Sequence, residues 1–276
     1  MMKLGAFVHM NQDIGAGEAF QKLMDMGLTT CQLACWQRER LTDAFTRDVN
    51  AAAARTGIEI SAFWCGWGPP VTWDFYDGPL TLGLVPAAYR HERLETLIEG
   101  VEFARKIGVT DIATHVGYIP ENPNDPDYRG VIIALKEIVR HCRGNGQYFL
   151  FETGQETPVT LRRAIEDLGG ENVGINLDPA NLLMYGKANP VDALDVFGQY
   201  VRGVHAKDGE YPTDGRRLGV EKRLGEGRVN FPAFIRKLKS IGYSRPITIE
   251  REIEGEEQAR DILYAKELLT KLCEEE

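Results

Sequence analysis

Four residues of metal-binding type stand near the ends of β-like segments in the second half of the chain. They are Glu152 in YFLFET (148–153), Asp178 in VGINLD (173–178), His205 in VRGVHAKD (201–208) and Glu250 in PITIERE (246–252). Three carboxylates brought together raise one another's pKa, so they stay ionised together only beside a cation. One imidazole and three carboxylates form a mostly hard donor set. The residues therefore predict one bound divalent metal ion, Mn²⁺ first, with Mg²⁺, Co²⁺ or Zn²⁺ as alternatives.

Each of the four residues alone has a plainer structural explanation. Asp178 precedes Pro179, a pair typical of a helix N-cap followed by proline at the first helical position. Glu152 and Glu250 could each pair with a nearby Arg or Lys, and a lone strand histidine is more often a core residue than a ligand. Because all four occur at successive strand ends, the metal site is favoured over four separate structural roles.

These residues need a scaffold that brings successive strand ends together. Apolar or β-branched segments alternate with amphipathic stretches along the chain, which indicates repeated βα units. The other four β-like segments are LGAFVH (4–9), TTCQLAC (29–35), EISAFWC (59–65) and DIATHV (111–116). Helical patterns cover 91–108, 129–146, 157–170, 230–243 and 256–276, and glycines typical of helix C-caps are Gly27, Gly57, Gly108 and Gly242. Eight such units in 276 residues predict an α/β fold, a (β/α)8 TIM barrel forming a single domain over residues 1–276.

Side chains alternate between the two faces of a strand, which puts the polar groups on the inner face of such a barrel. Glu152 shares its face with Leu150, and Glu250 shares its face with Thr248. Residues of the opposite parity, such as Phe151, are apolar and suit packing beneath the helices. Active sites of this fold lie at the carboxyl ends of the strands, so the four groups are expected at the barrel mouth.

Two connections are too long for simple turns: 66–90 after the third strand and 209–229 after the seventh. The first contains Trp67, Trp73 and Phe75, and it is too aromatic for a disordered segment. We expect it to form a folded lid over the barrel mouth. An Ω-loop packed for its own stability is the alternative.

Several segments resemble the xylose isomerase-like barrels, the sugar phosphate isomerase/epimerase superfamily, and in particular its ketose 3-epimerase branch. They are LFETG (150–154), NLDPAN (176–181), GVHAKDG (203–209), LGEGRVNF (224–231) and ITIERE (247–252). The resemblance implies that Glu152, Asp178, His205 and Glu250 bind one divalent metal ion. It also implies that Glu152 and Glu250 are the catalytic acid/base pair. One departure is Asn181, which stands where that branch commonly has a substrate-binding histidine.

The chemistry expected of such a site is proton transfer beside a ketose carbonyl. A metal ion chelated by the carbonyl and a neighbouring hydroxyl would stabilise the enediolate formed when the α-proton leaves. Glu152 and Glu250 would remove and return that proton, each as base in one direction and acid in the other. We therefore expect a metal-dependent isomerase or epimerase of a sugar or sugar phosphate.

Six further residues are candidates for substrate binding: His9, His115, Trp67, Asn181, Lys207 and Arg217. The two histidines end or lie in strands on the mouth side, where neutral imidazoles bond hydroxyls, although a buried structural role is as plausible. Lys207 shares a face with His205, so it contacts a substrate hydroxyl or pairs with a carboxylate. Asn181 contacts substrate or caps a turn. Arg217 belongs to a basic cluster in 209–229, which recognises an anionic group or is simply solvated.

The composition argues against several partner classes. Lys and Arg number 32 against 41 Asp and Glu, a net charge of −9, and no run of five basic residues offers a nucleic-acid or membrane surface. The five cysteines are dispersed, which favours reduced thiols in a cytoplasmic protein. Neither a signal peptide nor a span of about 18 apolar residues is expected. A small carbohydrate is the expected partner, and the resemblance implies a homodimer or homotetramer.

A metal-dependent dehydratase of a keto-sugar or inosose on the same barrel is the main alternative, because it needs the same metal and base. An apurinic endonuclease is disfavoured, since its three-zinc cluster needs many histidines and this chain has five. A hydride-shift isomerase would need a second metal, for which Asp208 is the only nearby candidate ligand. A non-catalytic sugar-binding barrel would bind no metal.

Overall fold

Parallel strands close into a barrel in the computed structural model, which describes residues 2–10 and 14–275. The order around the barrel is β1-β10-β7-β6-β5-β4-β3-β2, so strands that follow one another along the chain are neighbours. The strands are β1 (Leu4–His9), β2 (Thr30–Cys35), β3 (Glu59–Cys65), β4 (Asp111–Thr114), β5 (Tyr148–Glu152), β6 (Val173–Leu177), β7 (Val201–Ala206) and β10 (Ile247–Ile249). These strands confirm the predicted (β/α)8 barrel and bring the carboxyl ends of β5, β6, β7 and β10 together.

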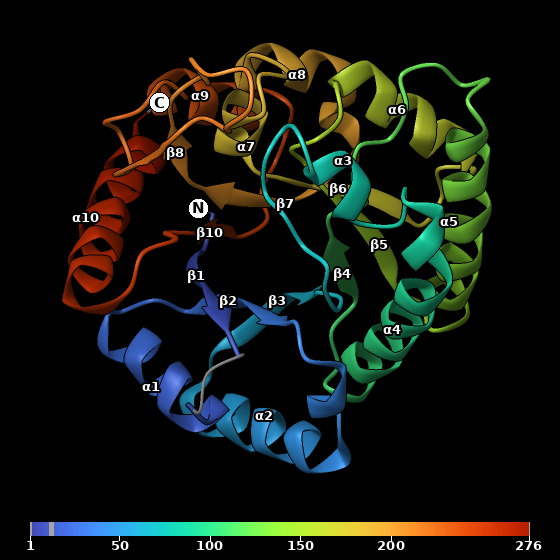
Figure 1. Cartoon of the computed structure of the whole chain (residues 1–276). Helices are drawn as coiled ribbons and strands as arrows, with labels where there is room; N and C mark the ends of the chain where they lie inside the picture. The colour runs from blue at the N-terminus through green and yellow to red at the C-terminus, as the bar shows by residue number, and fades with distance from the viewer. Residues whose placement is uncertain (1, 11–13, 276) are drawn as a thin grey trace.

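Helices form a ring around these strands (Figure 1). The longer ones are α1 (Ala16–Asp25), α2 (Asp43–Thr56), α4 (Ala87–Lys106), α5 (Pro126–Gly144), α6 (Pro158–Asp167), α8 (Pro190–Phe197), α9 (Phe231–Ser240) and α10 (Gly255–Glu274). Shorter elements are α3 (Gly78–Thr81), α7 (Pro179–Met184), and the 3-10 turns η1 (Arg38–Arg40) and η2 (Gly198–Tyr200). The C-cap Gly57 has a φ of 72°, a left-handed conformation that favours glycine, as the sequence predicted. No helix of the described residues is long and apolar enough to cross a membrane.

The strands divide their side chains between two apolar clusters. Phe149 and Phe151 of β5 belong to the large cluster between the barrel and the helices, and both are fully buried. Leu150 belongs to a smaller cluster with Trp64 and Ala113. Burying a side chain of phenylalanine size contributes about 1.5–3 kcal/mol, so a one-residue shift of β5 would be costly. The predicted alternation, with Glu152 on the inner face, is therefore strongly fixed.

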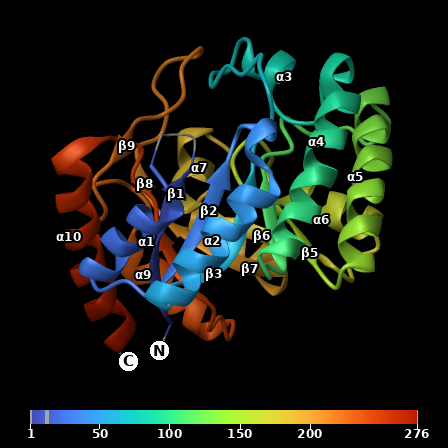
Figure 2. The same cartoon turned by 90° about the horizontal axis from the view of Figure 1, so that it is seen from below.

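The two long connections rise from the same end of the barrel (Figure 2). The first, which we call the lid (66–86), contains α3. The second carries a small antiparallel hairpin, β8 (Asp208–Gly209) with β9 (Glu221–Lys222), which the sequence analysis did not predict. The two connections touch, because the backbone N–H of Phe75 donates to the carbonyl of Arg216 at 3.1 Å. The lid is folded, as predicted.

Boundaries differ from the predicted ones where strands run into the mouth. The segment predicted as strand 111–116 is regular only to Thr114, and the segment predicted as 201–208 is regular only to Ala206. His115 and Lys207 therefore lie just beyond their strands. Between the sixth and seventh strands the sequence indicated only the helix start at Asp178-Pro179, where α7 begins, and α8 was not predicted.

Candidate metal centre

Three side chains at the mouth of the barrel lie close enough to hold one metal ion. Glu152 ends β5, Asp178 follows β6, and His205 lies in β7. One ligand atom from each lies within 4.8 Å of the other two. All three residues are at most 1% exposed, and such buried charged groups need partners. The structure thus brings together three of the four residues predicted as ligands.

Glu250, the fourth predicted ligand, lies against the same imidazole. It follows β10, and its Oε2 is 2.8 Å from Nδ1 of His205. Oε1 of Glu152 lies 3.2 Å and Oδ2 of Asp178 lies 3.8 Å from that nitrogen. Three carboxylates therefore surround one nitrogen, which can carry at most one proton. A divalent cation at this point would balance their charge.

Two atoms at the centre of this cluster have no well-oriented hydrogen bond within the described part of the chain: Nδ1 of His205 and Oδ2 of Asp178. Buried polar atoms are almost always paired with protein, water or an ion. The other oxygen of Asp178 is paired, since Oδ1 accepts from the backbone N–H of Asn181 at 2.9 Å and caps α7. Asp178 is therefore the predicted helix cap, and it also offers a free ligand oxygen. The donor set fits a divalent metal ion.

Gln32 in β2 orients His205. Nε2 of His205 lies 2.8 Å from Oε1 of Gln32 and 2.9 Å from Nδ2 of Asn176, so two side-chain amides hold the ring with Nδ1 turned towards the carboxylates. The amide of Gln32 donates to Oδ1 of Asn176 at 2.7 Å, and Nδ2 of Asn176 donates to Oε2 of Glu152 at 2.5 Å. This chain of hydrogen bonds positions two of the predicted ligands. It was not predicted, although an amide inside the apolar strand TTCQLAC was a visible signal.

Burial and neighbouring charges separate the pKa values of the two glutamates. Burial raises the pKa of Glu152. Burial also opposes ionisation of Glu250, but Lys207 and His205 outweigh it and hold its pKa at about 2. Burial acts to lower the pKa of His205, whereas Glu152 and Glu250 raise it well above its usual value. Two carboxyl groups with pKa values shifted apart form the pattern of a catalytic acid and base.

Lys207 is buried in ion pairs, as the salt-bridge alternative predicted. Its Nζ lies 2.7 Å from Oε1 of Glu252, and 3.6 Å from both Oδ2 of Asp178 and Oε2 of Glu250. Oδ1 of Asn181 accepts from the same ammonium at 3.5 Å. Lys207 therefore puts a positive charge beside two predicted ligands. Glu252 is a further residue of the mouth that the sequence did not single out.

His115 lies at the mouth in an aromatic setting. Its Nδ1 is 3.1 Å from Oε1 of Gln155, and its ring centroid is 5.6 Å from that of Trp64 and 5.2 Å from that of Trp73. Burial lowers the pKa of His115 to about 4, so the ring is neutral at pH 7. A neutral imidazole here can bond a hydroxyl, as predicted.

The remaining predicted contact residues differ in exposure. Trp67 is buried in the lid, and its indole N–H has no partner among the described residues. His9 at the end of β1 and Arg217 in the second long connection have exposed side chains. Asp208 is used structurally: its carboxylate accepts backbone N–H groups in the connection after β7, those of Gly209, Gly225, Gly227 and Val229.

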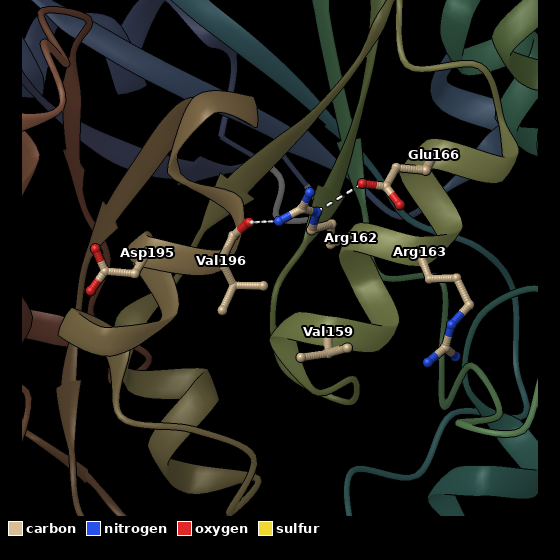
Figure 3. Close-up of a pocket in the computed structure, with 6 residues that line it drawn as sticks. All are labelled: Val159, Arg162, Arg163, Glu166, Asp195 and Val196. Atoms are coloured by element: carbon tan, nitrogen blue, oxygen red, sulfur yellow. Dashed lines mark hydrogen bonds and ion pairs between the residues drawn. The ribbon is translucent and has the colours of Figure 1, made fainter.

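A surface hollow of about 480 Å³ lies elsewhere, between α6 and α8. Figure 3 shows Arg162 of α6 reaching Glu166 and the carbonyl of Val196, with Nε–Oε1 and Nη1–O distances of 2.8 and 3.5 Å. None of its lining residues belongs to the cluster at the strand ends. The barrel mouth is therefore the candidate site.

The model of a family described as xylose isomerase-like TIM barrels matches residues 20–272. The chain belongs to this family. This xylose isomerase-like barrel is 33% identical to a xylose isomerase domain protein from Planctomyces limnophilus, covering 98% of this chain and 97% of the other, with a TM-score of 0.91. It is 24% identical to a D-tagatose 3-epimerase-like protein, covering 99% and 97% of the chains, with a TM-score of 0.74.

One curated relative of the barrel is an uncharacterized protein, MJ1311, from Methanocaldococcus jannaschii. The two are 28% identical over 194 residues, which is 66% of this chain and 62% of the relative. Solved structures that share the fold at lower identity include sugar epimerases and a probable dehydratase. The fold is shared by proteins of several activities, so the activity must be argued from the site.

Proposed function

We propose that this barrel is a divalent-metal-dependent isomerase or epimerase of a sugar, acting by proton transfer beside a carbonyl group. The observation that carries the proposal is the convergence of Glu152 and Glu250 on one side of His205, 3.2 and 2.8 Å from Nδ1. Two carboxyl groups so placed, with pKa values shifted in opposite directions, suit the two halves of a proton transfer.

Glu152, Asp178, His205 and Glu250 are the residues that would hold the ion. When bound, a divalent metal ion supplies Lewis-acid stabilisation of negative charge on the substrate oxygens. Glu250, whose pKa is lowered, is the base that takes the proton at its carboxylate. Glu152, whose pKa is raised, is the acid that returns a proton, and the roles exchange in the reverse direction. Lys207 stabilises the ionised form of Glu250.

The roles of the chain's other residues follow from their contacts. Gln32 and Asn176 keep His205 and Glu152 oriented through their hydrogen bonds. The lid, with Trp73 against His115, keeps water from the mouth side of the site. Exclusion of water strengthens every electrostatic interaction inside the site.

A dehydratase of a keto-sugar or inosose is the second candidate, and Lys207 favours it. Its ammonium is 3.6 Å from Oε2 of Glu250, so one group could remove a proton while the other protonates a departing hydroxyl. A dehydratase needs the same base as the isomerase or epimerase. The two reactions differ only in what happens to the substrate after the proton is removed.

Incubation with ketohexoses, ketopentoses, their phosphates and inososes in deuterium oxide with added Mn²⁺ tests the proposal. An isomerase or epimerase that acts by proton transfer incorporates deuterium into recovered sugar, whereas a dehydratase releases an unsaturated or deoxy product. Glu250→Gln and Glu152→Gln should each lower kcat at least a hundredfold. If both variants fold, bind metal and keep full turnover, the assignment is wrong.

A further inference from the structure

Glu156, four residues beyond the predicted ligand Glu152, is a buried carboxyl group to which the proposed proton transfer gives no role. It is 2% exposed, and neither Oε1 nor Oε2 has a hydrogen-bond partner in the part of the chain that the structure describes. Leaving a buried polar group unpaired costs about 1–3 kcal/mol, and more for a charged one. A group kept at this cost beside a catalytic centre indicates a ligand that completes its bonding.

The backbone two residues before Glu156 is packed tightly. A Cβ added at Gly154 would lie 3.2 Å from the Tyr185 ring and 3.4 Å from the His115 ring. The adjacent Gln155 faces the mouth, because its Oε1 lies 3.1 Å from Nδ1 of His115. These contacts place the loop after β5 in the wall of the site beneath the lid.

The groups around Glu156 are aromatic or charged. The Tyr118 hydroxyl, whose pKa is raised by burial and by the nearby Asp74 and Glu156, donates to the lid carbonyl of Asp74 at 2.8 Å. Lys187 lies 5.8 Å from the centroid of the Tyr118 ring. The charge of Lys187 acts to lower the pKa of Glu156, and the charge of Glu152 acts to raise it. Glu156 is therefore near enough to feel the charge of the predicted metal ligand Glu152, and it also acts on Tyr118, which contacts the lid.

Burial raises the pKa of Glu156 to about 8, so the group is mostly a neutral carboxylic acid at pH 7. A neutral carboxyl group both donates and accepts hydrogen bonds. A hydroxyl group does the same, so each can donate to the other. A phosphate dianion is an acceptor that needs several donors, whereas a neutral carboxyl group donates only one hydrogen bond.

We propose that Glu156, together with Gln155 and His115, forms a subsite that binds a neutral hydroxyl group at the end of the substrate remote from the metal. The proposal rests on the function proposed above and narrows its substrate class to unphosphorylated sugars. Glu156 is a specificity-determining residue here and takes no part in the proton transfer.

Glu156→Gln and Glu156→Leu test the proposal, assayed on the D-ketohexose that the protein turns over fastest, on its 6-phosphate and on its 6-deoxy analogue. Glutamine keeps a donor and an acceptor, so KM should stay within about threefold of wild type. Leucine removes both, so KM for the neutral sugar should rise at least tenfold while kcat changes little. Glu156→Ala serves if leucine prevents folding, and Glu171→Leu, at an exposed glutamate, is the matched control.

The 6-deoxy analogue shows whether the lost bond is the proposed one. Wild type should bind this analogue more weakly than it binds the parent sugar. The affinity for the analogue should fall little further in Glu156→Leu. An unchanged KM in both Glu156→Leu and Glu156→Ala, or a preference for the 6-phosphate, would overturn the proposal.

Binding without turnover separates this proposal from the function on which it rests. Trp64 and Trp73 contact His115, so titration of tryptophan fluorescence with D-fructose, D-psicose, D-tagatose or D-sorbose reports occupancy. If the protein binds one of these sugars but turns none of them over, and Glu156→Leu weakens that binding, the subsite is supported and the isomerase proposal is contradicted. Absence of binding to wild type contradicts the subsite.

Discussion

The two ring nitrogens of His205 have different kinds of partner. Nδ1 is surrounded by the carboxylates that follow or end β5, β6 and β10, whereas Nε2 meets the side-chain amides of Gln32 in β2 and Asn176 in β6. A metal ion needs an imidazole nitrogen that faces it, and the two amides hold the ring so that Nδ1 faces the carboxylates. Metal affinity should therefore depend on a residue that does not touch the ion.

Gln32→Leu should weaken Mn²⁺ binding by about 10–100-fold, because the imidazole loses one of the two amide contacts that orient it. Isothermal titration calorimetry of the apoprotein measures the change. Gln21→Leu makes the same substitution on α1, where the amide pairs with exposed Asp25, and should leave the affinity unchanged. Equal Mn²⁺ affinity in Gln32→Leu and wild type would contradict the role of Gln32.

The clustering of the predicted ligands could be foreseen from the sequence and the residues that support them could not, for a physical reason. Each ligand stands at a strand end, and chain order determines which strand ends meet in a barrel. Gln32 and Asn176 act through a contact between strands that are distant in sequence, and strand periodicity does not say which interior side chains touch. Glu156 acts from a loop, whose conformation no periodicity specifies.

At the scale of elements, alternation predicted the strands and their inner faces, whereas the long connections show no repeating signal. The β8–β9 hairpin has two residues in each strand, too few for an alternating pattern. Arg93, which belongs to α4 and not to the lid, holds the lid in place and is 2% exposed. Its guanidinium donates to the carbonyls of Gly68, Pro70, Thr81 and Gly83. The lid therefore depends on a helix that follows it in the chain.

Arg93→Met should loosen the lid while the barrel stays folded. Burial lowers the pKa of Arg93 to about 10, so the guanidinium is still charged at pH 7, and its removal leaves four carbonyls without their donor. Each such bond to a charged group contributes roughly 1.5–3 kcal/mol. Hydrogen–deuterium exchange should accelerate in 66–86 and stay slow in the barrel strands.

Arg140→Met, on the outer face of α5 where Arg140 pairs with Glu137, is the control and should leave the lid protected. Unchanged exchange throughout 66–86 in Arg93→Met would show that the lid packs independently of α4.

At the scale of the whole molecule, the two ends of the barrel have separate electrostatic tasks. At the mouth, carboxylates surround His205, whereas at the opposite end a buried carboxylate pairs with arginines. Asp111 at the start of β4 is 1% exposed and pairs with Arg202 of β7 at 2.6 Å and with Arg245 before β10 at 2.8 Å. These pairs join strands on opposite sides of the barrel. In this fold the amino-terminal end serves stability and the carboxyl-terminal end serves chemistry.

Asp111→Asn should therefore lower stability and spare the site. Removing the buried charge leaves two guanidinium groups repelling each other, which costs about 2–4 kcal/mol given that both arginines are partly exposed. Urea unfolding should show a lower midpoint, while Mn²⁺ affinity and kcat at 25 °C stay within twofold of wild type. Asp195→Asn, which breaks an exposed pair with Lys237, should change stability by less than about 1 kcal/mol. A tenfold loss of Mn²⁺ affinity in Asp111→Asn would show that the two ends are coupled through the strands, because no residue of the Asp111 cluster contacts the ligands.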